Sequence, residues 1–266
     1  MSIFRSDLLA GKVAFITGGG TGICKGIARG LALHGAHTAI VSRKADHVGP
    51  ASQEIAAGTS TRSLPLVADV RQPDQIDAAV QQAVKEFGKI DYLINGAAGN
   101  FLCPAAQLSA NGFGTVIDID TKGTWHTTKA VFDAWMRDHG GVILNISATL
   151  QVGGTPMQIH ASAAKAAIDA MTKNLAVEWG PLGIRTNAIA PGGIGDTEGA
   201  RRLIPAGFMD RLVKSIPIRR IGEIEDCVNL TLFLFSEAAR NINGAIIVTD
   251  GGHSLVGAYL NPEDLG

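Results

Sequence analysis

A glycine-rich turn near the N-terminus has the residue types and the spacing needed to bind a pyrophosphate group. The apolar segment Val13–Thr17 leads directly into Gly18-Gly19-Gly20-Thr21-Gly22, and a helical apolar pattern begins at Ile23. Glycines let a backbone approach a ligand closely, and the free amides and dipole of a helix N-terminus attract negative charge. An ordinary strand-to-helix turn would also contain glycines. We favour pyrophosphate binding by Gly18, Thr21, Gly22 and Ile23 because this turn opens the first βα unit of an alternating chain.

A second candidate binding residue, Arg43, follows the apolar segment His37–Ser42. In dinucleotide-binding folds an acid at the end of the second strand binds the ribose hydroxyls of NAD, whereas a basic residue there pairs with the 2′-phosphate of NADP. This chain has Ser42-Arg43-Lys44 and no acid at that point. A solvated basic loop would contain the same residues. We favour NADP(H) as the cofactor, with Arg43 as its phosphate ligand.

An alternating series of strands and helices is needed to position these residues. Apolar, β-branched segments predict seven strands, at 13–17, 37–42, 62–67, 91–94, 141–146, 184–189 and 245–249. Helical patterns of about 12 to 20 residues lie between most of these segments. The sequence therefore predicts an α/β fold of the Rossmann type. We expect a doubly wound parallel sheet with helices on both faces and ligands at the carboxyl ends of its strands.

Length and composition limit the remaining possibilities. A chain of 266 residues, 46% of them hydrophobic, can bury one large core, and we expect a single NADP(H)-binding domain over residues 1–266. An irregular stretch from Pro191 to Ile218 predicts a mobile substrate flap at about 192–218. A net charge of −1 gives no electrostatic argument for a nucleic-acid or membrane partner. No apolar run approaches the roughly 20 residues that cross a bilayer. We expect no metal ion, because Cys24, Cys103 and Cys227 lack the spacing of metal ligands.

Several short motifs occur in one order over almost the whole chain, from about Lys12 to Gly252. They are Thr17-Gly18-x-x-x-Gly22-Ile23, Asp69-Val70, Asn95-Gly96-Ala97-Ala98-Gly99, Lys165 in an Ala-Lys-Ala-Ala setting, Pro191-Gly192 and Asp250-Gly251-Gly252. This set resembles the short-chain dehydrogenase/reductase family. The resemblance implies a cofactor cleft in which Asp69 and Val70 lie by the adenine, and whose other lining residues are Asn95, Ala97, Pro191, Gly192 and Ile194. Cys24 stands where the family usually has its third glycine, so we expect the helix and the strand to separate slightly there.

The catalytic positions of the family are mostly changed in this chain. The family has a serine after the fifth strand and a tyrosine four residues before the lysine, and that tyrosine donates a proton to a carbonyl. The corresponding residues here are Ala148 and Ala161, while the family's asparagine corresponds to Asp120. Lys165 alone is kept. The resemblance therefore does not imply ordinary alcohol–ketone chemistry.

Longer segments resemble one subgroup of the family, the peroxisomal-type 2,4-dienoyl-CoA reductases. The matching segments are Gly96–Pro104, Val116–Thr121, Arg137–Ile143, His160–Ala167, Ala176–Pro181 and Gly199–Leu203. That subgroup also lacks the tyrosine–serine pair and has an aspartate at the asparagine position. The resemblance implies NADPH-dependent reduction of a 2,4-dienoyl-CoA to a 3-enoyl-CoA, a step in the β-oxidation of unsaturated fatty acids.

The chemistry of that reaction explains why a phenol is dispensable. Hydride adds to the far end of the conjugated thioester, and negative charge develops on the thioester oxygen, where hydrogen-bond donors stabilise it. The proton then goes to the α-carbon instead of a carbonyl oxygen. We predict that Asp120 and Lys165 hold the water that delivers this proton and that Lys165 also binds the ribose. Asp250 would complete the network, although it would serve equally well to tie down a turn.

Other residues are candidates for binding the acyl-CoA substrate. Asn100 and Phe101 either line the acyl pocket or cap the loop after the fourth strand. Arg201 and Arg202 suit the phosphates of CoA, because guanidinium groups bind phosphate well, but a solvated flap would contain the same residues. His160 would serve either as an acid near neutral pH or as a structural histidine.

Two further functions stay open at this point, together with location and assembly. The chain could be a reductase of another enoyl- or 3-ketoacyl thioester, or a catalytically silent NADPH-binding protein.

We expect a cytoplasmic protein, with a peroxisomal one as the alternative; the sequence ends in Pro262-Glu263-Asp264-Leu265-Gly266 without a Ser-Lys-Leu-type address. The resemblance to the family implies a homodimer or tetramer in which the helices carrying Asp120 and Lys165 pair. The small side chains of Ala163, Ala167 and Ala170 would permit close helix approach, although this face could equally pack on the sheet.

Overall fold

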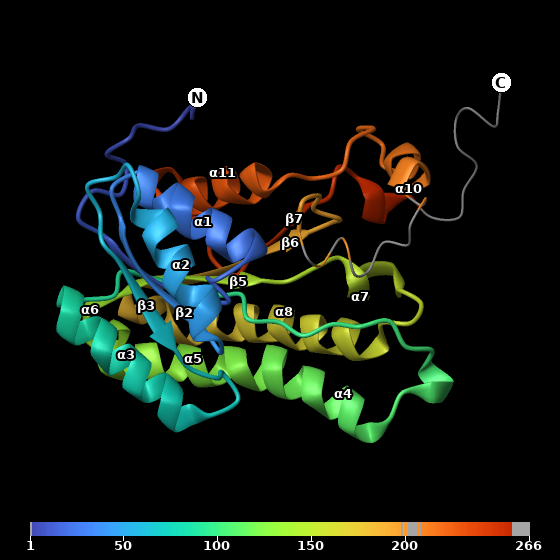
Figure 1. Ribbon diagram of the computed structural model, residues 1–266, viewed down its shortest axis with the longest axis horizontal. Helices are drawn as coiled ribbons and strands as arrows, with labels where there is room; N and C mark the ends of the chain where they lie inside the picture. Colours follow the sequence, from blue (N-terminus) through green and yellow to red (C-terminus); the bar gives the residue numbers. More distant parts are fainter. Residues whose placement is uncertain (1, 198, 200, 202–206, 208, 257–266) are drawn as a thin grey trace.

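A seven-stranded sheet forms the centre of the computed structural model, which describes residues 2–197, 199, 201, 207 and 209–256 (Figure 1). All neighbouring strands are parallel, in the order β3-β2-β1-β4-β5-β6-β7. The strands are β1 (Val13–Thr17), β2 (His37–Ser42), β3 (Ser63–Val67), β4 (Tyr92–Asn95), β5 (Gly141–Ile146), β6 (Ile184–Pro191) and β7 (Ile246–Thr249). The strand order reverses between β1 and β4, which is where such sheets open a ligand crevice at their carboxyl edge. The predicted doubly wound α/β fold is confirmed.

Helices cover both faces of this sheet (Figure 1). One face carries α1 (Gly22–Leu33), α2 (Ala45–Ala56) and α11 (Ile224–Phe235); the other carries α3 (Pro73–Phe87), α5 (Gly123–Val131) and α8 (Ile159–Trp179). The shorter α-helices are α4 (Ala110–Val116), α6 (Arg137–His139), α7 (Leu150–Gly153) and α10 (Met209–Ser215). The described residues also form two π-helical segments and four 3₁₀ turns. The π-helical segments are η2 (Ile117–Lys122) and η3 (Phe132–Met136), and the 3₁₀ turns are η1 (Ala105–Gln107), η4 (Gly180–Leu182), η5 (Glu237–Ala239) and η6 (His253–Leu255).

Alternate side chains of each central strand enter different cores. Ala14 and Ile16 pack with α1, α2 and α11, whereas Phe15 between them packs with α3, α5 and α8. All three side chains are fully buried. This two-sided burial is the reason that the strands appear in the sequence as unbroken apolar runs instead of alternating ones.

The stretch from Pro191 to Ile218 is not irregular throughout, which corrects the sequence-based prediction. The strand β6 continues to Pro191, and α10 forms a helix of seven residues within the stretch. Leu212 of α10 lies beside Gly193, and such packing stabilises helices that are too short to be stable by themselves. Residues 198, 200, 202–206 and 208 lie outside the described part of the chain, so the substrate flap at 192–218 stays a prediction.

Two features of the described residues concern a membrane and a metal ion as possible partners. None of the helices found there is long and apolar enough to span a bilayer. No group of three or more His, Cys, Asp and Glu side chains in that part of the chain is arranged to hold a metal ion.

Candidate active site

The turn between β1 and α1 leaves backbone donors open at the carboxyl edge of the sheet. Gly18 has φ +71°, and a Cβ there would lie 2.7 Å from the carbonyl oxygen of Gly96. Gly22 has φ +54°, and a Cβ there would meet nothing within 4 Å. Thr21 is the N-cap of α1, but its side chain accepts no capping hydrogen bond, and the first turn has no acid. This arrangement fits a bound pyrophosphate, which would take up the free N–H groups of α1.

Thr17 fixes the turn to the neighbouring strand β4. Its Oγ1 accepts hydrogen bonds from the backbone N–H of Gly96 at 3.1 Å and of Ala97 at 3.3 Å. Cys24 faces the same loop, and its Sγ lies 2.0 Å from the position that a Cβ on Gly96 would take. The absence of a side chain at Gly96 therefore provides room for Cys24. Burial raises the pKa of the Cys24 thiol to about 12, which makes it a packing group and not a nucleophile.

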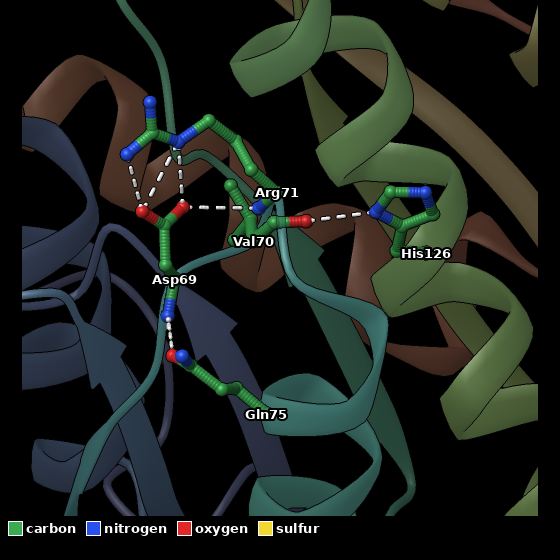
Figure 2. Close-up of polar contacts among 5 residues, drawn as sticks. All are labelled: Asp69, Val70, Arg71, Gln75 and His126. Atoms are coloured by element: carbon green, nitrogen blue, oxygen red, sulfur yellow. Dashed lines mark hydrogen bonds and ion pairs between the residues drawn. The ribbon is translucent and has the colours of Figure 1, made fainter.

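Arg43 and Asp69 lie at the ends of β2 and β3. Arg43 is exposed, and among the described residues its guanidinium has no hydrogen bond or ion pair, which leaves it free for a phosphate. The Asp69 carboxylate pairs with Arg71, with 2.6 Å between Oδ2 and Nη2, and its Oδ1 accepts from the backbone N–H of Arg71 at 3.0 Å (Figure 2). The hydrogen bonds from Arg71 lower the pKa of Asp69, although partial burial opposes them.

Val70 links the Asp69 segment to α5. Its side chain is buried against Gly123, and its carbonyl oxygen accepts a hydrogen bond from Nδ1 of His126 at 2.9 Å (Figure 2). The backbone N–H of Asp69 donates to Oε1 of Gln75 at 2.9 Å. The segment is thus anchored on both sides. Its predicted place beside the adenine stays a prediction.

Asn95 has a side chain that is buried in the interior. Nδ2 donates to Oγ1 of Thr128 at 2.8 Å and to Oδ1 of Asn145 at 2.9 Å, and Asn145 donates in turn to Thr172 at 2.9 Å. These bonds join β4 to α5, β5 and α8. The side chain of Asn95 therefore supports the loop beginning at Gly96, and contact with the cofactor stays a prediction for Asn95 and Ala97.

Asp120 and Lys165 form a buried ion pair, as their predicted shared role requires. Oδ2 of Asp120 lies 3.1 Å from Nζ of Lys165, and their side chains are 1% and 10% exposed. Oδ1 of Asp120 accepts a hydrogen bond from the N–H of Gly99 at 2.7 Å, and Nζ of Lys165 donates to the carbonyl oxygen of Ile146 at 3.0 Å. Both charges thus have further partners, which a buried ion pair needs to offset its desolvation.

Two helical segments, η2 and α8, carry the two members of the ion pair. Asp120 lies in the π-helical segment η2, between α4 and α5, and Lys165 lies in the second turn of α8. Single π-helical segments within α-helices occur frequently at functional sites. The carbonyl of Ile146 and the N–H of Gly99 come from the carboxyl ends of β5 and β4. The ion pair therefore lies at the edge of the sheet where ligands bind.

The positions that would normally hold serine and tyrosine contain no proton donor. Ala161 is buried on α8, and Ala148 follows the end of β5. The neighbouring hydroxyl of Ser147 is directed to Asp169, donating to Oδ1 at 2.6 Å. Asp169 also accepts from Gln151, so this network holds α7 against α8. The hydroxyl of Ser147 does not replace the missing one.

Asp250 forms a turn of its own after β7. Its two carboxylate oxygens accept hydrogen bonds from the N–H groups of Gly252 at 2.8 Å and Ser254 at 2.7 Å. Burial alone would raise its pKa, but these hydrogen bonds and the nearby His253 lower it overall. The geometry supports the alternative that Asp250 ties down a turn. Its catalytic role stays a prediction.

The segment after β6 lies against this turn. Gly192 packs so closely on Asp250 that a Cβ at Gly192 would lie 2.7 Å from that of Asp250. Pro191 and Ile194 are buried, and Ile194 forms a bridge with Gly222. The structure thus gives Pro191, Gly192 and Ile194 fixed positions at the carboxyl end of β6, and their place in the lining of the cofactor cleft stays a prediction.

Asn100 and Phe101 lie in the loop after β4, next to Gly99 and therefore next to the ion pair. Nδ2 of Asn100 donates to Oε1 of Gln158 at 2.6 Å, and the Phe101 side chain is partly exposed. Arg201 is exposed, and Arg202 lies outside the described residues. The structure thus brings Asn100 and Phe101 close to the Asp120–Lys165 ion pair.

The sequence-based prediction missed Arg71 and Gln158, which hold Asp69 and Asn100. No local pattern marks Gln158, because its partner lies 58 residues away. Arg71 stands two residues after Asp69, so a bidentate pair would have been a reasonable expectation.

Comparison with known proteins agrees with this geometry. A family model described as enoyl-(acyl carrier protein) reductase matches residues 18–254. The chain is 51% identical to the peroxisomal 2,4-dienoyl-CoA reductase, (3E)-enoyl-CoA-producing, of Rattus norvegicus, over 99% of this chain and 89% of the rat protein. The protein of that name in Danio rerio is 50% identical over 96% of this chain and 86% of its own length.

A solved structure gives the same result for the fold. A short chain dehydrogenase from Bacillus anthracis superposes with a TM-score of 0.88 at 40% identity, over 95% of this chain and 100% of the other. The chain therefore belongs to the short-chain dehydrogenase/reductase family.

Proposed function

We propose that this protein reduces 2,4-dienoyl-CoA thioesters to 3-enoyl-CoA products with NADPH, in the β-oxidation of unsaturated fatty acids. The observation that carries the proposal is the buried Asp120–Lys165 pair in a site whose serine and tyrosine positions are both alanine. The names of the rat and zebrafish relatives support the same substrate class. A catalytically silent protein would not need these two charges for proton transfer, although breaking the pair would still cost stability.

The family and its Rossmann-type fold bind a nicotinamide cofactor. We assign NADPH because Arg43 is exposed at the end of β2 and is free to pair with a 2′-phosphate. When bound, this cofactor supplies the hydride. The free amides at the start of α1 would hold its pyrophosphate, and Lys165 would hold its ribose.

The residues of the chain would then control the proton. Hydride addition at C5 of the dienoyl group breaks its C4–C5 double bond and moves the electron pair through the conjugated system to the thioester oxygen. The Asp120–Lys165 pair would hold a water beside C2, and a proton would pass from that water to C2. The hydroxide that the water leaves would take up a proton from bulk solvent. The remaining double bond lies between C3 and C4. No group needs to protonate a carbonyl oxygen, which is consistent with Ala148 and Ala161.

Substrate binding would come from the loops at the same edge of the sheet. Asn100 and Phe101 lie beside Gly99, whose N–H holds Asp120, so the acyl chain would pass over them. Arg201 and Arg202, in the proposed flap at 192–218, would bind the CoA phosphates. Asp250 would act by fixing the turn on which Gly192 packs.

We further propose a homodimer or tetramer built on the outer face of α5 and α8. A cavity of about 470 Å³ lies between these helices, and Trp125, Lys129, Ala170, Met171 and Asn174 line part of it. Trp125 is 42% and Val177 is 77% exposed, which is unusual for such large apolar side chains.

The cytoplasmic location stays a prediction, and the relatives are named as peroxisomal.

A spectrophotometric assay tests the function directly. NADPH absorbance is followed with a 2,4-dienoyl-CoA, a 2-enoyl-CoA and a 3-ketoacyl-CoA, and then with a simple ketone. We expect turnover with the dienoyl-CoA alone and a 3-enoyl product by mass spectrometry and NMR. Turnover of the ketone would show that another residue has replaced the tyrosine, and a 2-enoyl product would place the proton at C4 instead of C2. NADPH binding without any turnover would support the silent protein instead.

A further inference from the structure

The loop after β4 is fastened to the start of α8 by three hydrogen bonds, which together we name the loop clasp. The N–H of Cys103 donates to the carbonyl oxygen of Met157 at 2.9 Å. Nδ2 of Asn100 donates to Gln158 at 2.6 Å, and Nε2 of His160 lies 3.0 Å from the carbonyl oxygen of Phe101. The clasp ends where Gly99 meets Asp120, so it fixes the loop beside the catalytic pair.

His160 is the most enclosed member of the clasp. Its side chain is 0% exposed, and its ring stacks on that of Phe101 with 4.3 Å between centroids and 24° between planes. A carbonyl oxygen only accepts hydrogen bonds, so Nε2 must carry the proton in the bond to Phe101. Nδ1 is buried and has no partner within the described chain.

This arrangement leaves His160 poorly placed to donate a proton to substrate. Its one protonated nitrogen is occupied by Phe101, and none of its surface reaches solvent. Phe101 differs, because 39% of its side chain stays exposed while one ring face rests on the imidazole. The histidine therefore supports an aromatic surface that another molecule can contact.

We propose that His160 is a positioning residue that fixes the ring of Phe101 as the surface on which the dienoyl chain lies. The inference rests on the proposed function and specifies how that site recognises its acyl group. Flat conjugated chains stack well on aromatic rings, and a ring held in one orientation loses less entropy on binding. The clasp thus contributes to substrate affinity and not to the proton transfer.

Two substitutions separate the hydrogen bond from the bulk of the side chain. His160→Gln keeps an N–H that can reach the carbonyl oxygen of Phe101, whereas His160→Leu removes both the donor and the ring. His139→Leu is the matched control, because His139 also stacks on an aromatic ring, that of Trp135 at 3.7 Å, and bonds its carbonyl oxygen at 2.8 Å. His139 lies in α6, before the start of β5 and thus at the other end of the sheet.

We expect His160→Leu to raise KM for the dienoyl-CoA about tenfold, the scale of one lost hydrogen bond or aromatic contact. His160→Gln should stay within about threefold of the unchanged protein, and kcat should change by less than about threefold in both. Affinities for NADPH and for free CoA should not change, since neither touches Phe101. His139→Leu should leave all of these values unchanged.

Other outcomes would overturn the inference. A hundredfold loss of kcat in His160→Gln at constant KM would make the histidine an acid, and equal weakening of NADPH, CoA and dienoyl-CoA would make it merely structural. If His160→Leu does not fold, His160→Ala takes its place: by itself it should raise KM about tenfold, and in a Phe101→Leu background it should have no further effect on KM. An added effect of equal size would contradict the proposal.

The proposed function can fail without hiding this result. If the unchanged protein turns over no dienoyl-CoA, the affinity of dienoyl-CoA relative to free CoA is measured by calorimetry. A preference for the acylated form that His160→Leu and Phe101→Leu both remove would still support the aromatic surface. No preference at all would overturn it.

Discussion

Two aspartates at the carboxyl edge of the sheet form ion pairs, and their surroundings differ greatly. Asp120 and Lys165 lie 3.1 Å apart with side chains that are 1% and 10% exposed. Asp69 and Arg71 lie 2.6 Å apart with side chains that are 17% and 36% exposed (Figure 2). Both pairs have good geometry, yet only the first is removed from water. Distance alone therefore does not indicate what an ion pair contributes.

The two ion pairs also differ in how far apart their members lie in the sequence. Arg71 follows Asp69 by two residues, so the pair forms within one turn and costs little chain entropy. Asp120 and Lys165 are 45 residues apart and meet only after η2 and α8 have packed together. Breaking a buried pair by removing one partner typically costs about 3–5 kcal/mol, whereas an exposed pair contributes about 0–1 kcal/mol. We infer that the buried pair does chemistry and the exposed pair shapes a loop.

Asp120→Asn is expected to have the largest effect. Asparagine keeps an oxygen for the N–H of Gly99. It cannot carry the charge that, in the proposed mechanism, would position the proton-donating water. Turnover of dienoyl-CoA should fall by about 10² to 10⁴, the usual contribution of general acid catalysis. NADPH affinity, measured by fluorescence titration, should stay within about threefold.

Two further variants complete that test. Asp118→Asn is the control, because Asp118 lies in the same π-helical segment and pairs with Lys122 at the surface at 2.7 Å; it should leave turnover unchanged. Lys165→Met should lower cofactor affinity and turnover together, since it removes the proposed ribose contact as well as the charge. Full turnover by Asp120→Asn would mean that the carboxylate is structural and that the proton arrives by another route.

Arg43→Ala is expected to have an intermediate effect, on the side of the cleft where Asp69 lies. Arg43 is exposed, so its removal should not disturb folding. A charge-assisted hydrogen bond is worth about 1.5–3 kcal/mol, which corresponds to roughly ten- to a hundredfold in affinity. Dissociation constants for NADPH and NADH should therefore become similar in Arg43→Ala. Equal constants in the unchanged protein would contradict the assignment of NADPH.

Asp69→Asn is expected to have the smallest effect. Because Arg71 is more than a third exposed, solvent screening limits the pair to about 1 kcal/mol or less. Folding lowers the pKa of Asp69 below its unfolded pKa of about 3.9. The stabilisation by this ion pair is therefore fully present above the unfolded pKa, and it is lost as the pH falls through the pKa of Asp69 in the folded protein. Urea unfolding should show a small difference between variant and unchanged protein at pH near 7 that disappears as the pH falls below the lowered pKa of Asp69.

A comparison of the two aspartates also shows where this last prediction would fail. A loss of several kcal/mol in Asp69→Asn would mean that the Arg71 pair supports the fold as the buried pair does. A difference in stability that persists at low pH would show that the substitution acts through shape and not through charge.

The sequence by itself determined the strands, the glycine-rich turn and the basic residue after β2. These features depend on local chemistry: apolar runs of β-branched residues form buried strands, and glycines at 18 and 22 allow positive φ. Predicted and observed strand bounds agree within two residues. The proposed role of Asp120 was reached by resemblance, since nothing in its neighbours distinguishes it from Asp118, which is only partly buried.

Only the tertiary structure decided which polar groups meet. Asn95 turned inward to bond Thr128 and Asn145, Asp250 bonded its own turn, and His160 became the support of Phe101. The helix α10 formed where the sequence pattern was too short to predict one. Each of these outcomes depends on groups that lie far apart in the chain or on packing against them. Local sequence fixes backbone conformation and burial, whereas the partner of a polar side chain is set by the packing of whole elements.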